Sequence, residues 1–290
     1  MRIFCFYSYW ASILFFVSLI KYSKRLSVLY VSEVVMNTII LGSLFDSYHL
    51  GYIAVSLAIT AFLLWLPFRY IKKQKYKDLY LKIWALATFI LHISLMWVVF
   101  LQEGHATAYD NVLFPIYFCN MSMYLLLVVA FWGDKKSKFF GYFATVVAYA
   151  GAFGALISLF YPDYYLHGTS MFEWGVLKSM LSHSTMLIGS LYLFVGGYFK
   201  VNRFNAVIYS IGLLFFGAVG LIVNGVFAAA GLNAPNAMYL QHPPIEDVPF
   251  LNVYVIAALM VILVFAISFS YEVINKKLAV LKKPVTQENN

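Results

Sequence analysis

One thiol and one imidazole are the side chains best suited to covalent chemistry in this sequence. Cys119 lies in the run FPIYFCNMSMYLLL, and His183 lies in the run LKSMLSHSTML. A histidine that takes the proton of a cysteine produces a thiolate, which can attack acyl carbonyl carbons. The pair is therefore a candidate nucleophile with its candidate base. A cysteine that only fills space in an apolar core is the alternative.

Depth in the membrane favours His183 among the six histidines. At a rise of about 1.5 Å per residue from the expected outer helix ends, Cys119 lies about 10 Å deep, His183 about 8 Å and His92 about 13 Å. His183 is thus the candidate base, and His92 is a candidate orienting or structural group. Asn120 is the neighbour of the cysteine in the sequence.

A carboxylate in another apolar segment offers a third partner. Glu33 and Asn37 are one helical turn apart there, and an isolated ionised carboxylate in lipid is costly. Glu33 is therefore expected to be protonated, paired or beside a water-filled cavity, in a structural or a functional role. Paired with His183 or His92, it would complete a cysteine–histidine–acid relay.

Metal and cofactor binding are competing uses for several histidines. No His-x-x-x-His or Glu-x-x-His pair occurs in any expected helix, and neither a nucleotide-binding loop nor a serine nucleophile elbow is present. We therefore expect no metal and no cofactor. A metal site assembled from separate helices remains an alternative.

Transmembrane helices are the elements that position these residues. The 290-residue chain is 63% hydrophobic and only 11% charged, which is too few charges to cover a water-soluble domain. Its long apolar runs predict an all-α, polytopic transmembrane helix bundle of about nine spans. The expected spans are residues 3–20, 26–45, 50–71, 79–101, 112–132, 140–160, 178–198, 205–228 and 250–272.

Charge in the connecting loops predicts the orientation. One face holds 18 of the 20 basic residues, and only Arg2 and Lys178 lie on the other. The positive-inside rule makes the basic face cytoplasmic, so the N-terminus is expected outside and the C-terminus inside. The net charge of +8 is thus a topology signal, and no nucleic-acid partner is expected.

Composition divides the chain into three parts. Two N-terminal spans occupy residues 1–45, a seven-helix core occupies 46–275, and a basic, polar cytoplasmic tail occupies 276–290. We expect a multi-pass protein of the cell membrane without a soluble domain. No internal repeat is evident, which disfavours the inverted-repeat transporter folds. The sequence does not indicate an oligomeric state.

Several motifs resemble those of one family. His49 heads a span, and the other motifs are FPIYFC at 114–119, GAFGALISLFYPD at 151–163, LSHSTMLIGSLYL at 181–193 and NAMYLQHPP at 236–244. Together they are similar to the YwaF family of bacterial integral membrane proteins, over about residues 45–272. That family also includes an animal transmembrane protein that resembles an ether-phospholipid acyltransferase acting through a cysteine.

The resemblance implies a membrane phospholipid acyltransferase near the outer leaflet, with Cys119 as the acyl-accepting thiol and His183 as its partner. Asn236 and Tyr239 would match polar residues that line the outer site, and Asn120 or Asn236 would stabilise the oxyanion. Many members carry His or Gln two residues before the cysteine. This chain has Tyr117 there, which is a hydrogen-bond donor but a poor base near neutral pH. The expected partners are membrane phospholipids or lysophospholipids.

Two other functions fit the same residues. A lipid or small-solute transporter or flippase would line its path with Glu33, His92 and Asn224. A non-catalytic sensor or assembly protein would use its polar side chains only to hold the helices together.

Overall fold

The computed structural model describes residues 44–96, 112, 114–162, 165–166, 170–232, 235–244 and 248–281. All of them belong to the second of two compact units, Gly42–Asn290. Within these residues the chain forms seven α-helices and one short 3-10 helix, with no strand. The all-helical prediction is therefore confirmed for the described part of the chain. The expected span 3–20 and nearly all of 26–45, including Glu33, lie outside it.

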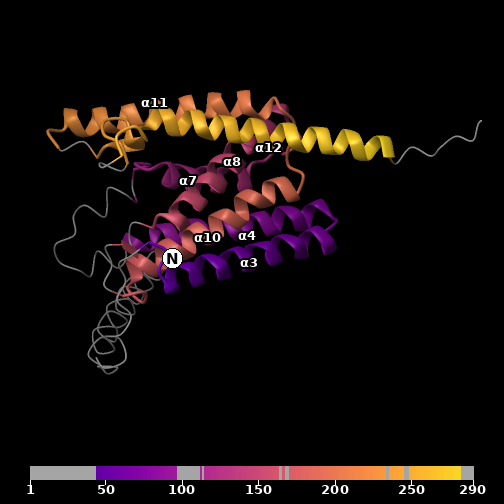
Figure 1. Ribbon diagram of the computed structural model, residues 1–290, viewed down its shortest axis with the longest axis horizontal. Coiled ribbons are helices and arrows are strands. Elements are labelled where there is room, and N and C mark those ends of the chain that lie inside the picture. Colours follow the sequence, from indigo (N-terminus) through magenta and orange to yellow (C-terminus); the bar gives the residue numbers. More distant parts are fainter. Residues whose placement is uncertain are drawn as a thin grey trace, which may run out of the picture. The chain divides into compact units, whose positions relative to one another are not determined.

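The helices pack around two central members, α8 and α10. α8 packs against α7, α10 and α11, and α10 also packs against α3 and α4. Figure 1 shows α11 and α12 side by side over part of their lengths, and the two helices are in contact. The elements are α3 (Ser47–Tyr70), α4 (Gln74–Ile93), α7 (Phe118–Phe131), α8 (Lys138–Phe160), α10 (Trp174–Val195), α11 (Asn205–Ala229), η1 (Ala237–Tyr239) and α12 (Val253–Leu281).

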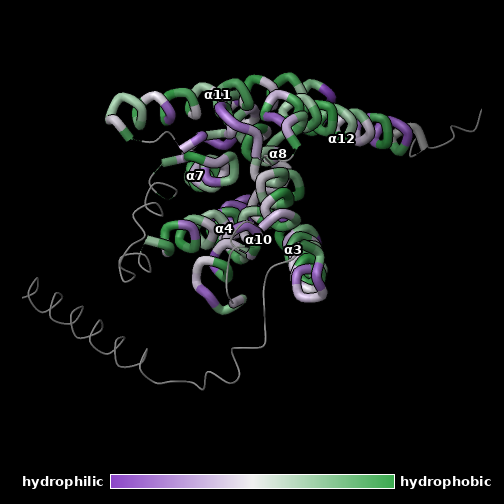
Figure 2. The backbone as a smooth tube through the Cα atoms, turned by 60° about the vertical axis from the view of Figure 1, so that its left-hand side comes forward, coloured by the Kyte–Doolittle hydropathy of each residue, from purple (hydrophilic) through white to green (hydrophobic). Residues whose placement is uncertain are grey.

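Several of these helices have the length and composition of membrane spans. Four in the described part qualify, namely Ser47–Tyr70, Lys138–Phe160, Asn205–Ala229 and Val253–Leu278, and α7 is apolar but shorter. Figure 2 shows hydrophobic residues along α3, α11 and α12, and many large apolar side chains of these helices are exposed. Lipid accommodates such surfaces, so the chain is a membrane protein. The total of nine spans and the orientation of the termini stay predictions.

Two helix boundaries near the candidate site differ from the prediction. α7 begins at Phe118 rather than at residue 112, because residues 114–117 are not helical. α4 begins at Gln74 rather than at residue 79 and ends at Ile93, and residues 97–101 of the expected span lie outside the described residues. The first turn of α4 is polar, so a search for apolar runs does not include it in the helix. A helix can extend beyond the membrane into water where its side chains are polar.

Two glycines allow α8 to approach its neighbours closely. A Cβ at Gly151 would collide with the Ser190 hydroxyl of α10. A Cβ at Gly154 would lie 3.3 Å from the Cys119 Cα of α7. The absence of side chains at these positions brings the three backbones together, as small residues do at membrane helix interfaces.

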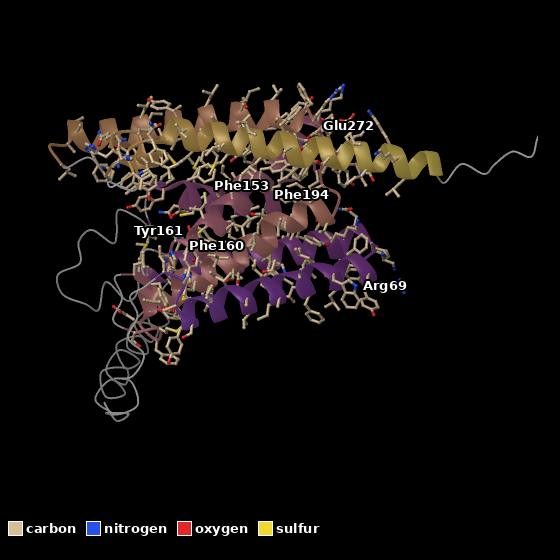
Figure 3. The ribbon with its side chains drawn as sticks, viewed as in Figure 1. Arg69, Phe153, Phe160, Tyr161, Phe194 and Glu272 are labelled. Atoms are coloured by element: carbon tan, nitrogen blue, oxygen red, sulfur yellow. The ribbon has the colours of Figure 1, made fainter. Side chains whose placement is uncertain are left out.

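One end of the bundle collects the ends of four helices. The start of α3 meets the end of α8, where His49 Nε2 lies 2.8 Å from the Leu159 carbonyl oxygen. The start of α10 meets the end of α4, where Trp174 Nε1 donates to Ser94 Oγ at 3.2 Å. Figure 3 shows Tyr161, just after α8, at this end and Arg69 of α3 at the opposite end.

Candidate active site

Cys119 lies in the first turn of α7, at the N-terminal end of the helix. Its Sγ lies 3.4 Å from Asn120 Oδ1, and the Ser158 hydroxyl also hydrogen bonds with the thiol. The backbone amides of Cys119 and Asn120 are directed at the same sulfur. These amides precede the first intrahelical bond, from Met121 N–H to Tyr117 O at 3.1 Å. Amides at a helix N-terminus attract negative charge.

The predicted depth of Cys119, about 10 Å below a helix end, is wrong, because α7 begins only one residue before it. Pro115 stands before the helix. The Ile116 carbonyl accepts from the Met238 N–H at 2.7 Å, which ties this segment to η1. The thiol is therefore presented at a helix end.

His183 lies on α10 with a side chain only 8% exposed. Its Nδ1 lies 2.7 Å from the Ser179 carbonyl oxygen, and since a carbonyl only accepts, Nδ1 carries the proton. Nε2 is buried and has no hydrogen-bond partner within the described residues, so it presents a lone pair. This tautomer has the form of a general base. Because α10 begins at Trp174, His183 stands about 14 Å from its helix end rather than about 8 Å.

His92 lies in the last turn of α4, which ends at Ile93, and the outer end of its expected span lies outside the described residues. Its ring meets the edge of Tyr124 with centroids 5.5 Å apart. Its Nε2 is also buried and without a partner in the part of the chain that the structure describes. His92 interacts electrostatically with His183, so the structure brings the two predicted histidines together.

A buried lysine, which its position in the sequence does not mark as a site residue, joins this cluster. Lys178, near the start of α10, is only 5% exposed. It interacts electrostatically with Cys119, His92 and His183. The signal in the sequence was its position as one of two basic residues on the otherwise acidic face. A lysine inside a membrane protein usually faces the bundle interior, as this one does.

The predicted asparagines near η1 hold backbone together. Asn224 Oδ1 accepts from Ala237 N–H at 2.8 Å, and its Nδ2 donates to Ala237 O at 3.3 Å. Asn236 Oδ1 accepts from the N–H groups of Gln241 and His242 at 2.9 and 3.1 Å. Both amides are therefore used to shape the loop beside the Cys119 segment.

Tyr117 and Tyr239 lie together in that loop region, stacked with their ring centroids 5.5 Å apart. Asn236, Met238 and Tyr239 all have positive φ, near 50–55°. Such backbone costs of order 1–3 kcal/mol per residue outside glycine and persists only where neighbouring contacts impose it. The hydrogen bonds between Asn224 and the Ala237 backbone, and the bond from the Met238 N–H to the Ile116 carbonyl, supply those contacts.

His49 is a structural histidine. It is fully buried, its Nδ1 accepts from Phe45 N–H at 3.0 Å, and its Nε2 donates to Leu159 O at 2.8 Å. Both ring nitrogens are thus engaged and neither is available for proton transfer. The bonds fasten the start of α3 to the end of α8.

Asp46 caps α3 beside this histidine. Its carboxylate accepts from the His49 N–H at 2.8 Å and from the Tyr165 hydroxyl at 2.7 and 2.8 Å. Burial acts to raise the pKa of the Asp46 carboxyl, but these hydrogen bonds outweigh it and hold that pKa below its usual value. Burial, and then the Asp46 carboxylate, raise the pKa of the Tyr165 hydroxyl.

Glu33, His105 and His167 lie outside the described residues. Within the residues that are described, no group of three His, Cys, Asp or Glu side chains could hold a metal ion. The site therefore consists of Cys119 on α7, His92 on α4, and Lys178 and His183 on α10, with the Asn224–Tyr239 region beside the thiol segment.

Comparison with known proteins identifies a family. The model of the TMEM164 family matches residues 44–271, more than three quarters of the chain, and this range includes the whole described site. The YwaF name that the motifs suggested is not confirmed. Comparisons with curated proteins and with solved structures gave no match.

Proposed function

Because this chain belongs to the TMEM164 family of membrane proteins, we propose that it is a phospholipid acyltransferase that carries the acyl group on Cys119. The observation that carries the proposal is the position of the thiol in the first turn of α7, with backbone amides directed at its sulfur. A buried imidazole whose Nε2 presents a lone pair, that of His183, belongs to the same electrostatic cluster. A thiol, a base and amide donors are the groups that acyl transfer through a thioester requires.

The first half-reaction forms the thioester. His183 Nε2 takes the Cys119 thiol proton, and the thiolate attacks the ester carbonyl carbon of a phospholipid. The bond from that carbon to the glycerol oxygen breaks, and the imidazolium gives its proton to the departing oxygen. A lysophospholipid leaves, and the acyl group stays on Sγ.

The second half-reaction transfers the acyl group. The hydroxyl of an acceptor lysophospholipid gives its proton to His183 and attacks the thioester carbonyl carbon. The carbon–sulfur bond breaks, and the Cys119 thiolate recovers the proton from the imidazolium. In both halves the amides of Cys119 and Asn120 are the candidate donors to the oxyanion.

The position of the thiol at a helix end suits this substrate. Glycerol ester carbonyls lie near the membrane interface rather than at the bilayer centre, so a membrane-bound nucleophile must also lie near the end of a span. Figure 3 shows Phe160 and Tyr161, at the end of α8 whose Ser158 hydrogen bonds with the thiol, at the opposite end of the bundle from Arg69.

The experiment that tests the proposal is detection of the acyl-enzyme. Purified protein is incubated in mixed micelles with phospholipid labelled in its acyl chain, and the label on protein is measured before and after hydroxylamine. We expect a hydroxylamine-labile label in the wild type and in Cys5→Ser, and none in Cys119→Ser. A wild type that never acquires label, or label that persists in Cys119→Ser, would contradict the proposal.

A further inference from the structure

A pocket separate from the thiol cluster lies where the chain turns from α3 into α4. Both helices pack against α10, and their joined ends line a pocket of about 490 Å³. Its lining residues include Lys72, Lys73, Tyr76, Leu79 and Ile83. Figure 3 shows Arg69, in the last turn of α3, at the opposite end of the bundle from Tyr161. The pocket therefore lies at the other end of the bundle from the candidate active site.

Lys72 is held at the edge of this pocket by the end of α3. Its Nζ donates to the Phe68 carbonyl oxygen at 2.7 Å and lies 5.6 Å from the centroid of the Phe68 ring. An ammonium has three N–H donors, so two remain for a ligand. Lys72 also lines a second, smaller pocket of about 120 Å³. Its charge is thus fixed in place beside an accessible space.

The charges of Lys72 and Lys73 are not neutralised by carboxylates. Lys73 is exposed and makes no side-chain hydrogen bond to the start of α4. Among the described residues no carboxylate forms an ion pair with either lysine, and the nearby Asp78 accepts from the Tyr198 hydroxyl at 2.8 Å. Lys77 is different, because its Nζ donates to the carbonyl oxygen at the end of α10 at 3.1 Å. Lys72 and Lys73 therefore leave the pocket with a net positive charge.

An exposed apolar stripe on α4 begins in the pocket and leads away from it. Its residues are spaced alternately by three and four positions, which places them on one face of the helix. They are Tyr76, Leu79, Ile83, Leu86 and Ile90, and each is between 39% and 53% exposed. At about 1.5 Å per residue the stripe is roughly 21 Å long, more than the roughly 15 Å of hydrocarbon in one leaflet. One acyl chain can therefore lie along it.

A phosphate attached to acyl chains matches this combination of two ammonium groups and an apolar stripe. Ammonium groups bind phosphate oxygens through charge-assisted hydrogen bonds. A zwitterionic phospholipid carries its own cation beside the phosphate, whereas an anionic phospholipid has a net negative charge that lysines at the membrane surface attract. The charge pattern of the loops predicts that this end faces the cytoplasm, where anionic lipids give the leaflet its negative potential.

We propose that the pocket at the α3–α4 turn binds one anionic phospholipid, with its phosphate at Lys72 and Lys73 and one acyl chain along the Tyr76–Ile90 face of α4. This site is distinct from Cys119 and does not depend on acyl transfer. An anionic lipid held there would fasten the turn between α3 and α4 to the membrane surface.

The test is lipid binding to the purified full-length chain, measured by native mass spectrometry in detergent. Phosphatidylglycerol and phosphatidylcholine with the same acyl chains are titrated separately. We expect the wild type to retain one phosphatidylglycerol more tightly than any phosphatidylcholine. The double variant Lys72→Gln/Lys73→Gln should bind phosphatidylglycerol about 10–30-fold more weakly, since each lysine at a membrane surface contributes about fivefold. Its binding of phosphatidylcholine should not change.

Two matched variants separate a site from a general effect of charge. Lys136→Gln/Lys138→Gln removes the same charge from exposed lysines before and at the start of α8, and should bind phosphatidylglycerol like the wild type. Lys72→Arg/Lys73→Arg keeps the charge and should retain binding. Phosphatidylglycerol should also raise the melting temperature of the wild type and leave that of Lys72→Gln/Lys73→Gln unchanged.

The proposal is overturned if Lys136→Gln/Lys138→Gln weakens binding as much as Lys72→Gln/Lys73→Gln, or if the two lipids bind the wild type equally. Displacement of the lipid by an equal concentration of glycerol 3-phosphate would show that the stripe on α4 contributes nothing, and would also overturn it. A lipid-free dimer that is lost in Lys72→Gln/Lys73→Gln would assign this face to a second copy of the chain instead. Cys119→Ser should bind phosphatidylglycerol like the wild type, so failure of this site and failure of the proposed acyl transfer are observed separately.

Discussion

The Nδ1 atom of His183 lies 2.7 Å from the carbonyl oxygen of Ser179, one turn earlier on the same helix. This bond sets the tautomer of the imidazole and leaves Nε2 unprotonated in a buried position. His49 is the opposite case, because both of its ring nitrogens are bonded to backbone groups. The two histidines should therefore respond differently to substitution.

Replacing His183 should slow the chemistry. Gln fills a similar space but cannot accept the thiol proton, so we expect His183→Gln to lower the rate of Cys119 acylation by about 10²–10⁴-fold, the usual contribution of a general base. Single-turnover formation of the acyl-enzyme measures this rate. Thermal unfolding should change little. A wild-type rate in His183→Gln would exclude His183 as the base.

Replacing His49 should weaken the fold instead. His49→Leu leaves the Phe45 N–H and the Leu159 carbonyl without their partner, at a cost of about 1–3 kcal/mol in the free energy of unfolding. The acylation rate per folded molecule should stay unchanged. Thermal unfolding in detergent and the single-turnover assay separate the two effects, and a slower rate at an unchanged melting temperature would show that His49 is not merely structural.

The apolar runs in the sequence predict the positions of the helices more accurately than they predict where each helix begins and ends. The expected spans 140–160 and 205–228 correspond to α8, Lys138–Phe160, and α11, Asn205–Ala229. Residues 114–117 are as apolar as a span, yet they are not helical, because the Ile116 carbonyl bonds to the Met238 N–H. Hydropathy cannot reveal a contact between positions so far apart in the chain.

The site was predictable to the extent that residue type identifies chemistry. Cys119 and His183 were candidates because a thiol and an imidazole are scarce in apolar segments. Lys178 was visible only as an exception to the charge pattern, because its burial depends on how α10 packs against other helices. The sequence suggests Asn224 only as a path-lining residue, because its hydrogen bonds to Ala237 depend on a loop whose course the sequence does not specify.

Asn224 should contribute to stability through those bonds. Asn224→Leu removes both partners of the Ala237 backbone, so we expect a loss of about 1–3 kcal/mol in the free energy of unfolding and faster proteolysis near η1. Asn224→Asp keeps the acceptor for the Ala237 N–H and should lose less. If Asn224 instead lined a solute path, both variants would unfold like the wild type.

The hydrogen bonds of the Asp46 carboxylate at the start of α3 should stabilise the fold by an amount that decreases at acid pH. The pKa of this carboxyl is lower in the folded protein than its ordinary value, so its stabilisation is complete above about pH 4 and disappears as the pH falls through the folded value. The difference in melting temperature between the wild type and Asp46→Asn should thus be constant from about pH 5 to about pH 8 and shrink below about pH 4.

Tyr165→Phe is the matched control for Asp46, because it keeps the ring beside His49 and removes one donor to the carboxylate. The difference in melting temperature between the wild type and Tyr165→Phe should have the same sign as that for Asp46→Asn, and its dependence on pH should be smaller. A difference between the wild type and Asp46→Asn that is as large at about pH 3 as at about pH 7 would mean that the carboxylate charge does not stabilise the cap.

The contact between Gly154 and Cys119 should limit what α8 tolerates at this position. A side chain at residue 154 would meet the Cys119 Cα at 3.3 Å and Cβ at 3.5 Å, and the Cα belongs to the backbone of α7, which cannot rotate away. We therefore expect Gly154→Val to displace the first turn of α7, to cost about 1–3 kcal/mol in stability and to slow Cys119 acylation.

Gly141→Ala is the control on the same helix. Nothing lies within 4 Å of its added Cβ, so the higher helix propensity of alanine should leave stability equal or slightly greater. If Gly154→Val were as stable and as readily acylated as Gly141→Ala, close approach of α8 would not be what positions the thiol.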